Sequence, residues 1–214
     1  MKRVVNLKAL YFGTPVVLVS SRNLDASTNL APMSSAWWLD RTAVLGMSVS
    51  SQTVRNLMER PECVLNLADA SMVGAVDRIA LMTGRPDIPE RKRQRGYTYE
   101  PDKFAAAGLT PVDSDLVAVQ GVHESPIRME GVVEAIRPIA DGNLRTLEIR
   151  IHRTHVDADL VMPLKDHYID PVKWDPLIMK FTEFFAGGRL IHPSALARGW
   201  EMPLLNEELA QNGR

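Results

Sequence analysis

The sequence has one cysteine, no long apolar run and almost no net charge, and each shortage excludes a class of protein. The single Cys63 cannot form a disulfide within the chain, and its apolar surroundings predict a buried, unreactive thiol. No segment approaches the roughly 18 consecutive apolar residues of a membrane-spanning helix. A formal net charge of −1 provides no excess of basic groups for a nucleic acid. We therefore expect neither a nucleic-acid nor a membrane partner.

The N-terminus does not have the pattern of a secretory signal. Lys2 and Arg3 are followed by an apolar stretch that is broken by Lys8 and then by residues 13–15, Gly-Thr-Pro. A signal peptide needs a longer apolar region and a small-residue cleavage site after it. We therefore expect a cytoplasmic protein.

The apolar residues that are present follow mainly the period of β-strands. Residues 15–20 form a short β-branched run, typical of a buried strand. Residues 126–136 and 144–156 flank an Asp-Gly turn at residues 140–143, which predicts a hairpin. Val54, Leu57 and Met58 have helical spacing and are followed by Pro61, which predicts a short helix, and residues 72–81 predict a second one. The expected fold is one mainly β, antiparallel domain over residues 1–214 with few helices.

Two segments differ from this pattern. Residues 84–103 combine prolines with a basic run at 91–95, so they form either a solvated surface loop or a flap whose arginines meet phosphates. The apolar segment at 174–214 begins with Asp175-Pro176, and Gly187 follows. Proline suits a helix start and glycine a helix end, which predicts an apolar helical tail.

A hydroxyl-rich turn at residues 48–53 is a candidate phosphate site. Ser50, Ser51, Gln52 and Thr53 fall at the N-cap and first turn of the predicted helix, where unpaired N–H groups and the helix dipole favour an anion. Ordinary capping by Ser50 or Ser51 is the alternative explanation.

A second candidate segment, residues 28–38, lies just before that turn in the chain. Ala31, Pro32, Ser34 and Ser35 are small enough to let the backbone approach a flat ring. The alternative is a core strand with its proline at a sheet edge. The next two residues, Trp37 and Trp38, would point to opposite faces of a strand.

The histidines do not suggest a shared metal. His152 and His155 are three apart on a predicted strand and so face opposite sides. His123, His167 and His192 are isolated in the sequence. The chain also has no Walker, Gly-x-Gly-x-x-Gly or nucleophile-elbow motif, so we assign no metal ligand and no catalytic side chain.

Taken in order, these segments resemble the flavin reductase-like family. The shared features are Asn-Leu-Ala-Pro-Met-Ser-Ser at 29–35, the hydroxyl-rich turn at 48–53, a strand ending near Asn66, Asp-Lys-Phe at 102–104, and Glu-Ser before a strand at 124–130. The similarity extends over about residues 10–195.

The resemblance implies an FMN-binding split barrel, an antiparallel Greek-key β-barrel. It implies a ring site at residues 29–36 and a phosphate site at 48–53. The implied cofactor-binding residues are Asn29, Ala31, Pro32, Ser34, Ser35, Ser48, Ser50, Ser51, Gln52 and Thr53. It further implies FMN as cofactor, NAD(P)H as co-substrate, a homodimer and an unidentified partner oxygenase. The apolar residues 177–185 could cover the neighbouring subunit or, alternatively, close the barrel of their own subunit.

One hairpin departs from the family pattern. Many NADH-dependent flavin reductases have Gly-Asp-His where this chain has Gly142-Asn143-Leu144, so the histidine is missing. Two functions follow from the resemblance: an NAD(P)H-dependent flavin oxidoreductase, or a flavin-binding module for electron relay or storage. A split barrel that has lost flavin is a third.

Overall fold

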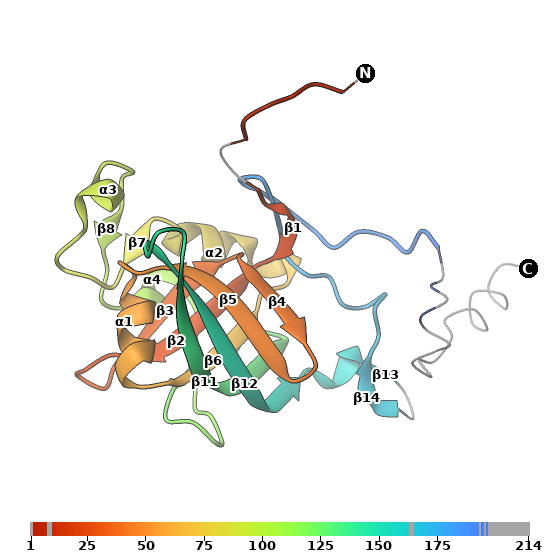
Figure 1. Ribbon diagram of the computed structural model, residues 1–214. Helices are drawn as coiled ribbons and strands as arrows, with labels where there is room; N and C mark the ends of the chain where they lie inside the picture. Colours follow the sequence, from red (N-terminus) through yellow and green to blue (C-terminus); the bar gives the residue numbers. More distant parts are fainter. Residues whose placement is uncertain (1, 8–9, 163–164, 193, 195, 197–214) are drawn as a thin grey trace, which may run out of the picture.

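The computed structural model describes residues 2–7, 10–162, 165–192, 194 and 196, which fold mainly into β-strands (Figure 1). Each strand of the main sheet is antiparallel to its neighbours. In chain order the strands are β2 (Val17–Arg22), β3 (Thr28–Met33), β4 (Ala36–Leu39), β5 (Thr42–Ser48), β6 (Glu62–Leu67), β11 (Ile127–Ile139) and β12 (Leu144–Val156). Across the sheet the order is β3-β2-β6-β11-β12-β5-β4.

This order explains why the sheet curls into a barrel. β3 and β4 lie at opposite edges of the sheet, yet only Ser34 and Ser35 separate them in the chain. The sheet must therefore curve until its edges approach. The pairing of β4 with β5 continues into the two-residue link, where the Gly46 N–H donates to the Ser35 carbonyl at 2.8 Å. β2 pairs with β6 and β5 pairs with β12, so the connections are not a simple meander. The mainly β, antiparallel barrel predicted from the sequence is confirmed.

The long hairpin of β11 and β12 also agrees with the prediction. Ala140 and Asp141 have positive φ values of 49° and 55°, and Gly142 follows at 83°, as tight hairpin turns require. Leu147 and Ile149 on β12 are fully buried, while the residues between them are more exposed. This alternation places one face of the hairpin on the core.

β2 is buried on both faces because two core clusters meet there. Val17 and Val19 face the barrel interior, where they pack with Leu45, Leu65 and Leu147. The alternate residues belong to the second cluster, whose members include Val16, Leu18, Leu30, Val76, Ile79, Phe104 and Leu177. Cys63 is fully buried in the first cluster, and burial raises the pKa of its thiol to about 12, as expected for an unreactive group.

Short helices connect the strands and cover one side of the barrel. They are α1 (Gln52–Glu59), η1 (Ala70–Met72), α2 (Val73–Ile79), α3 (Glu90–Arg93), α4 (Lys103–Ala107) and η2 (Ala158–Leu160). α2 and α4 contact each other and supply the second core cluster (Figure 1). The two predicted helices correspond to α1 and to η1 with α2. None of the described helices is long and apolar enough to cross a membrane.

The remaining strands form small sheets. They are β1 (Phe12–Pro15) with β15 (Ile178–Lys180) and β16 (Glu183–Phe185), β7 (Met82–Thr83) with β8 (Thr98–Tyr99), β9 (Pro111–Val112) with β10 (Gly121–Val122), and β13 (Val161–Met162) with β14 (Lys165–Ile169). Residues 84–103, here called the excursion, project from the barrel and carry the basic run and α3 (Figure 1). The pairing of β7 with β8 closes the base of this excursion.

The predicted apolar helical tail at 174–214 is wrong for its described part. Pro176 bridges to Asp69, and β15 then pairs with both β1 and β16. Leu177 is only 2% exposed and belongs to the second core cluster, so its apolar character reflects packing against the barrel. Strand pairing with a distant segment outweighed the local proline and glycine signals. Residues 197–214 lie outside the described part of the chain.

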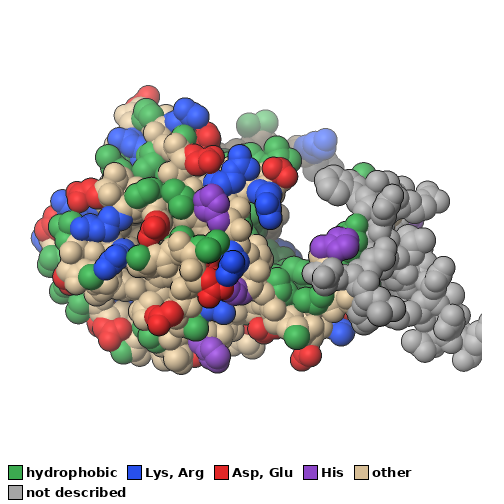
Figure 2. All heavy atoms as spheres, turned by 90° about the horizontal axis from the view of Figure 1, so that it is seen from below, with side chains coloured by type: hydrophobic (Ala, Val, Ile, Leu, Met, Phe, Trp, Pro, Cys, Tyr) green, Lys and Arg blue, Asp and Glu red, His purple; other side chains and the backbone are tan. Residues whose placement is uncertain are grey.

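The charge distribution agrees with the low net charge. On the face shown in Figure 2, Lys and Arg side chains are interspersed with Asp and Glu. No large single-sign area stands out on this face.

Candidate functional site

The turn that precedes α1 has the geometry expected of a helix start. Ser51 is the N-cap, and its Oγ accepts a hydrogen bond from the Val54 N–H at 3.1 Å. The Ser48 and Ser50 hydroxyls lie 2.9 Å apart. The Arg55 N–H is the first to donate to a carbonyl of this helix start, that of Ser51 at 3.3 Å. The N–H groups of Gln52 and Thr53 come before it in the first turn, where such groups are available as donors for an anion.

Asn29 connects this helix to β3. Its Nδ2 donates to Thr53 Oγ1 at 3.2 Å and to Ser21 Oγ at 3.4 Å. Asn29 and Thr53 are 2% and 1% exposed, so the contact is part of the interior. The structure therefore joins the start of the predicted ring segment to the predicted phosphate turn.

The other residues of the ring segment continue away from that contact. Ala31 and Pro32 are half-buried on β3, which is an edge strand of the sheet and can accommodate proline. Ser34 is buried, while the Ser35 hydroxyl lies 3.3 Å from the Tyr11 hydroxyl. Among the hydrogen bonds of the described residues, Asn29 is the only one of the predicted ring residues that bonds to α1.

Lys103 is a site residue that the sequence-based selection missed. It begins α4 and is only 3% exposed, with Nζ donating to Asn29 Oδ1 at 2.9 Å and to the Leu30 carbonyl at 2.7 Å. Burial, with a smaller contribution from Lys92, lowers the pKa of this ammonium to about 8. Neither of its hydrogen-bond acceptors carries a charge. The Asp-Lys-Phe motif was the only sequence signal for it.

Arg85 brings a second cation to the phosphate turn. Its Nη1 donates to the Ser50 carbonyl at 3.1 Å, and the same guanidinium is paired with Asp87. The preceding Gly84 makes this approach possible, since a Cβ there would lie 2.5 Å from Asn29 Oδ1. A larger residue would push the start of the excursion away from β3.

Within the basic run of the excursion, Lys92 is the residue that faces inward. It is half-buried, and burial followed by repulsion from Arg85 lowers its pKa. Its Nζ lies 5.1 Å from the centroid of the Tyr97 ring. Arg93, by contrast, is exposed and pairs with Glu90 at 3.4 Å. Arg85, Lys92 and Lys103 thus form a group of cations beside the start of α1.

The hairpin that lacks the family histidine lies against the same turn. The Val49 N–H donates to the Asn143 carbonyl at 3.1 Å, and Leu144 is the register partner of Ser48. Arg145 folds back, with its Nη1 donating to the Gly142 carbonyl at 2.7 Å. A substitution in this hairpin therefore acts on the candidate site itself.

His155 is not isolated in space. Its Nε2 lies 2.6 Å from Oε1 of Glu130, a buried residue of β11. The sequence analysis compared His155 only with His152 and did not identify Glu130 as its partner, because the two residues are 25 positions apart.

Comparison with known proteins identifies the family. Residues 9–177 match the model of the flavin reductase like domain. The protein YdfE of Bacillus subtilis (strain 168) is 36% identical over 183 residues, which is 85% of this chain and 87% of YdfE.

Solved structures with 25% identity or less share the fold. Flavoredoxin of Desulfovibrio vulgaris (Miyazaki F) is 23% identical with a TM-score of 0.74, covering 93% of this chain and all of that one (100%). Nitrilotriacetate monooxygenase component B of Bacillus cereus is 23% identical with a TM-score of 0.68, covering 85% and 87%. A split-barrel protein of Shewanella frigidimarina NCIMB 400 is 19% identical with a TM-score of 0.68, covering 86% and 87%. With its curled antiparallel sheet and its match over most of the chain, this protein belongs to the flavin reductase-like family and has the split-barrel fold.

Proposed function

We propose that this protein binds FMN at the start of α1 and is an oxidoreductase that transfers hydride from NAD(P)H to the flavin. The observation that carries the proposal is the convergence of α1, Asn29 and the buried Lys103 at one point. The donor set fits a phosphate monoester, because helix N–H groups and two cations meet there. FMN, when bound, supplies the hydride chemistry.

The protein's own groups would bind FMN and orient its ring. Gln52 and Thr53 N–H groups, with the hydroxyls of Ser48, Ser50 and Ser51, would hold the phosphate. Lys103 and Arg85 would balance its charge. Asn29, Ala31, Pro32, Ser34 and Ser35 would line the ring and ribityl chain, where small side chains admit the backbone. No side chain is required as an acid or base.

A titration with FMN and riboflavin tests the phosphate site. Replacing both Ser51 and Thr53 by alanine should weaken FMN binding more than riboflavin binding. Each hydrogen bond lost to a charged phosphate is worth about 1.5–3 kcal/mol. Asp69→Ala is the matched control, since Asp69 caps η1 and Ser51 caps α1. An equal loss for both flavins would indicate damage to α1 and overturn the phosphate assignment.

A second candidate function is a flavin-binding module without NAD(P)H turnover. It is favoured by the absent histidine at Leu144, beside the phosphate turn. Stopped-flow bleaching of bound FMN by NADH or NADPH separates the two. Rapid bleaching supports the oxidoreductase, and no bleaching supports the module. In the second case, N143D/L144H should introduce turnover if the histidine is the missing part.

We propose that the chain functions as a single cytoplasmic domain that forms a homodimer. Support for the dimer comes from apolar side chains left exposed near the β1–β15 pairing, among them Phe12 at 68% and Phe181 at 44%. Their rings contact each other with centroids 5.3 Å apart. Light scattering that finds a monomer with flavin still bound would contradict the dimer. A partner oxygenase is a further proposal, testable by coupled turnover with a flavin-dependent oxygenase.

A further inference from the structure

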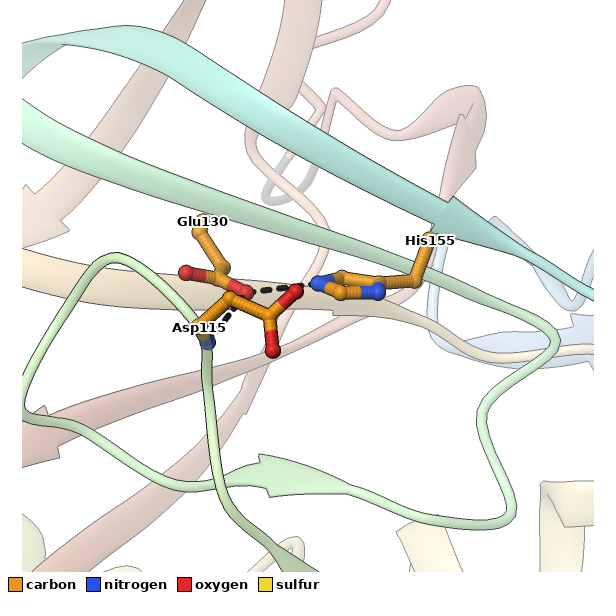
Figure 3. A group of neighbouring side chains, drawn as sticks. All are labelled: Asp115, Glu130 and His155. Atoms are coloured by element: carbon orange, nitrogen blue, oxygen red, sulfur yellow. Dashed lines mark hydrogen bonds and ion pairs between the residues drawn. The ribbon is translucent and has the colours of Figure 1, made fainter.

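Three potential metal ligands from three elements meet on the outside of the barrel (Figure 3). Asp115 lies in the loop between β9 and β10, Glu130 on β11 and His155 on β12. One ligand atom from each lies within 4.8 Å of the other two. In the described residues, no hydrogen bond or ion pair connects these three residues with the candidate flavin site.

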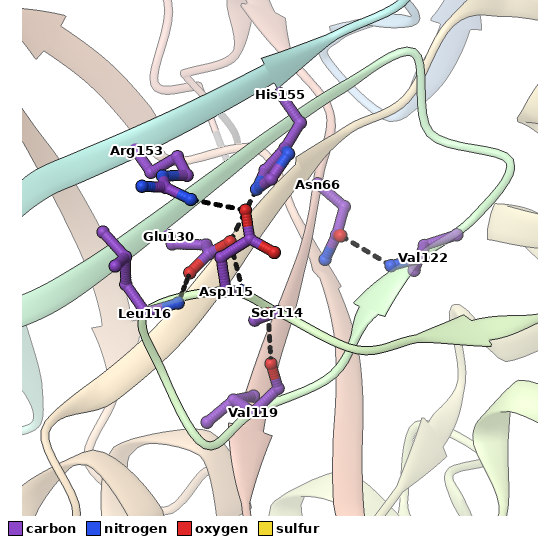
Figure 4. A network of polar contacts seen from close by, with 9 residues as sticks. All are labelled: Asn66, Ser114, Asp115, Leu116, Val119, Val122, Glu130, Arg153 and His155. Atoms are coloured by element: carbon purple, nitrogen blue, oxygen red, sulfur yellow. Dashed lines mark hydrogen bonds and ion pairs between the residues drawn. The ribbon is translucent and has the colours of Figure 1, made fainter.

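Glu130 is the fixed member of this cluster. It is 1% exposed, and its carboxylate accepts hydrogen bonds from the backbone N–H groups of Asp115 at 3.0 Å and Leu116 at 2.6 Å (Figure 4). Burial alone would raise its pKa, but these bonds and the contact with His155 lower it overall. The two backbone donors therefore hold the carboxylate in one orientation.

Strand register brings His155 to that carboxylate. Glu130 pairs with Arg153, and His155 lies two positions further along β12, on the same face as Arg153. Its Nε2 is 2.6 Å from Glu130 Oε1, so the ring nitrogen points into the acidic group. Two lone pairs at this distance repel each other unless a proton or a cation lies between them.

The ligand types and the charge fit a divalent transition metal. Two carboxylates balance a doubly charged ion, and one imidazole nitrogen favours zinc-like metals over magnesium or calcium. Ligands of one zinc ion lie about 3–4 Å apart, given metal–ligand distances of about 2.0–2.2 Å. The 2.6 Å between Glu130 Oε1 and His155 Nε2 is shorter than this spacing, so the imidazole must withdraw from the buried carboxylate as the ion enters. Asp115, an exposed loop residue, must turn towards the ion as the third ligand.

We propose that Asp115, Glu130 and His155 bind one divalent transition-metal ion, which fastens the loop between β9 and β10 to the barrel. Arg153 competes with the metal, because its Nη1 pairs with Asp115 Oδ2 at 2.5 Å. Asp115 would exchange the guanidinium for the ion. Because no hydrogen bond or ion pair of the described residues joins the cluster to the candidate flavin site, this proposal is independent of the proposed function.

Calorimetric titration of the chelator-treated full chain with Zn²⁺ tests the site. We expect one zinc ion per chain at low micromolar concentration, and much weaker binding of Mg²⁺. D115N and H155Q should each weaken zinc binding by about 10-fold or more, since each removes one of three ligands. H152Q is the matched control, because His152 is an exposed histidine of the same strand that is not one of the three proposed ligands.

R153Q tests whether Arg153 competes with the metal for Asp115. Removing the competing guanidinium should tighten zinc binding by up to about five-fold, the range expected for an exposed ion pair. Zinc should also raise the melting temperature of the wild type but not of H155Q. FMN titration of H155Q should match the wild type, which separates this test from the proposed function. No stoichiometric zinc binding by the wild type, or equal binding by H155Q, would show that the cluster is only a hydrogen-bonded anchor for the loop.

Discussion

Lys103 and Glu130 are both charged side chains in the interior, but the fold treats their charges differently. Lys103 donates only to the neutral oxygens of Asn29 and Leu30, and its pKa is lowered to about 8, towards the uncharged form. Glu130 accepts from two backbone N–H groups and faces His155, and its pKa is lowered towards the charged form. A buried ion that its surroundings leave uncompensated points to an anionic ligand. A buried ion that is fully hydrogen-bonded points to a structural role or to a metal.

The largest expected effect comes from removing Glu130, the buried charge that is fully hydrogen-bonded. Glu130→Ala removes the acceptor for the Asp115 and Leu116 N–H groups and should lower the free energy of unfolding by about 3–5 kcal/mol. Glu134→Ala on the same strand is the control. Its exposed pairing with Arg150 should contribute less than about 1 kcal/mol. Urea denaturation measures both, and similar losses would contradict the structural role of Glu130.

The next largest effect concerns Lys103, the buried cation without a charged partner, and the affinity for FMN. Lys103→Met removes the buried cation and should weaken FMN binding by about 1.5–3 kcal/mol, with a smaller effect on riboflavin. Lys173→Met is the matched control, since Lys173 is an exposed lysine that donates to the Asp159 carbonyl. Fluorescence titration with each flavin measures the affinities. If Lys103→Met bound FMN as tightly as the control, Lys103 would not belong to the site.

The same lysine predicts a dependence on pH. In the free protein Lys103 loses its proton near pH 8, whereas an unfolded lysine keeps it to about 10.5. Between these values the unfolded chain holds more protons, so this group makes the free energy of unfolding rise with pH. FMN binding needs the ammonium, so its affinity should fall as pH increases above about 8, by up to about 10-fold per pH unit.

FMN titrations at pH 7, 8 and 9 measure this dependence. In Lys103→Met, the fall in FMN affinity above pH 8 that is due to Lys103 should be absent. Parallel curves for the two proteins would assign the pH effect to another group.

The smallest effect concerns the excursion. Lys92→Gln should raise the KM for NAD(P)H about three-fold at low salt and less at high salt, because Coulomb attraction to phosphate is screened. Arg93→Gln is the control, since Arg93 is exposed and already paired with Glu90. The sequence analysis considered the arginines of the run for this role, whereas Lys92 is the cation of the run that is half-buried. Equal KM values for both variants would favour a simple solvated loop.

More of the fold than of the site could be predicted from the sequence. The strands and helices follow local sequence patterns, whereas the site depends on contacts between residues far apart in the chain. Alternation along β12 and the hydroxyls before α1 are local patterns, and both indicated the observed elements. The burial of Lys103 is not local, because an isolated lysine is ordinarily exposed and only α4 packing on β3 encloses it. The contact of His155 with Glu130 depends on strand register, which includes a bulge after Glu130. The tail was mistaken for a helix because its partner, β1, lies more than 160 residues earlier.

The base of the excursion has a consequence for how this protein could change over evolution. The Thr98 N–H donates to the Leu81 carbonyl at 3.0 Å and the Glu100 N–H to the Thr83 carbonyl at 2.9 Å, so both ends of the segment are anchored. Gly84 and Arg85 secure the entry side against Asn29 and Ser50. Residues 86–97 can therefore be exchanged for segments of other length and charge while the phosphate turn stays in place. The excursion can therefore vary in sequence without disturbing the turn at residues 48–53, as is usual for a surface loop on a rigid scaffold.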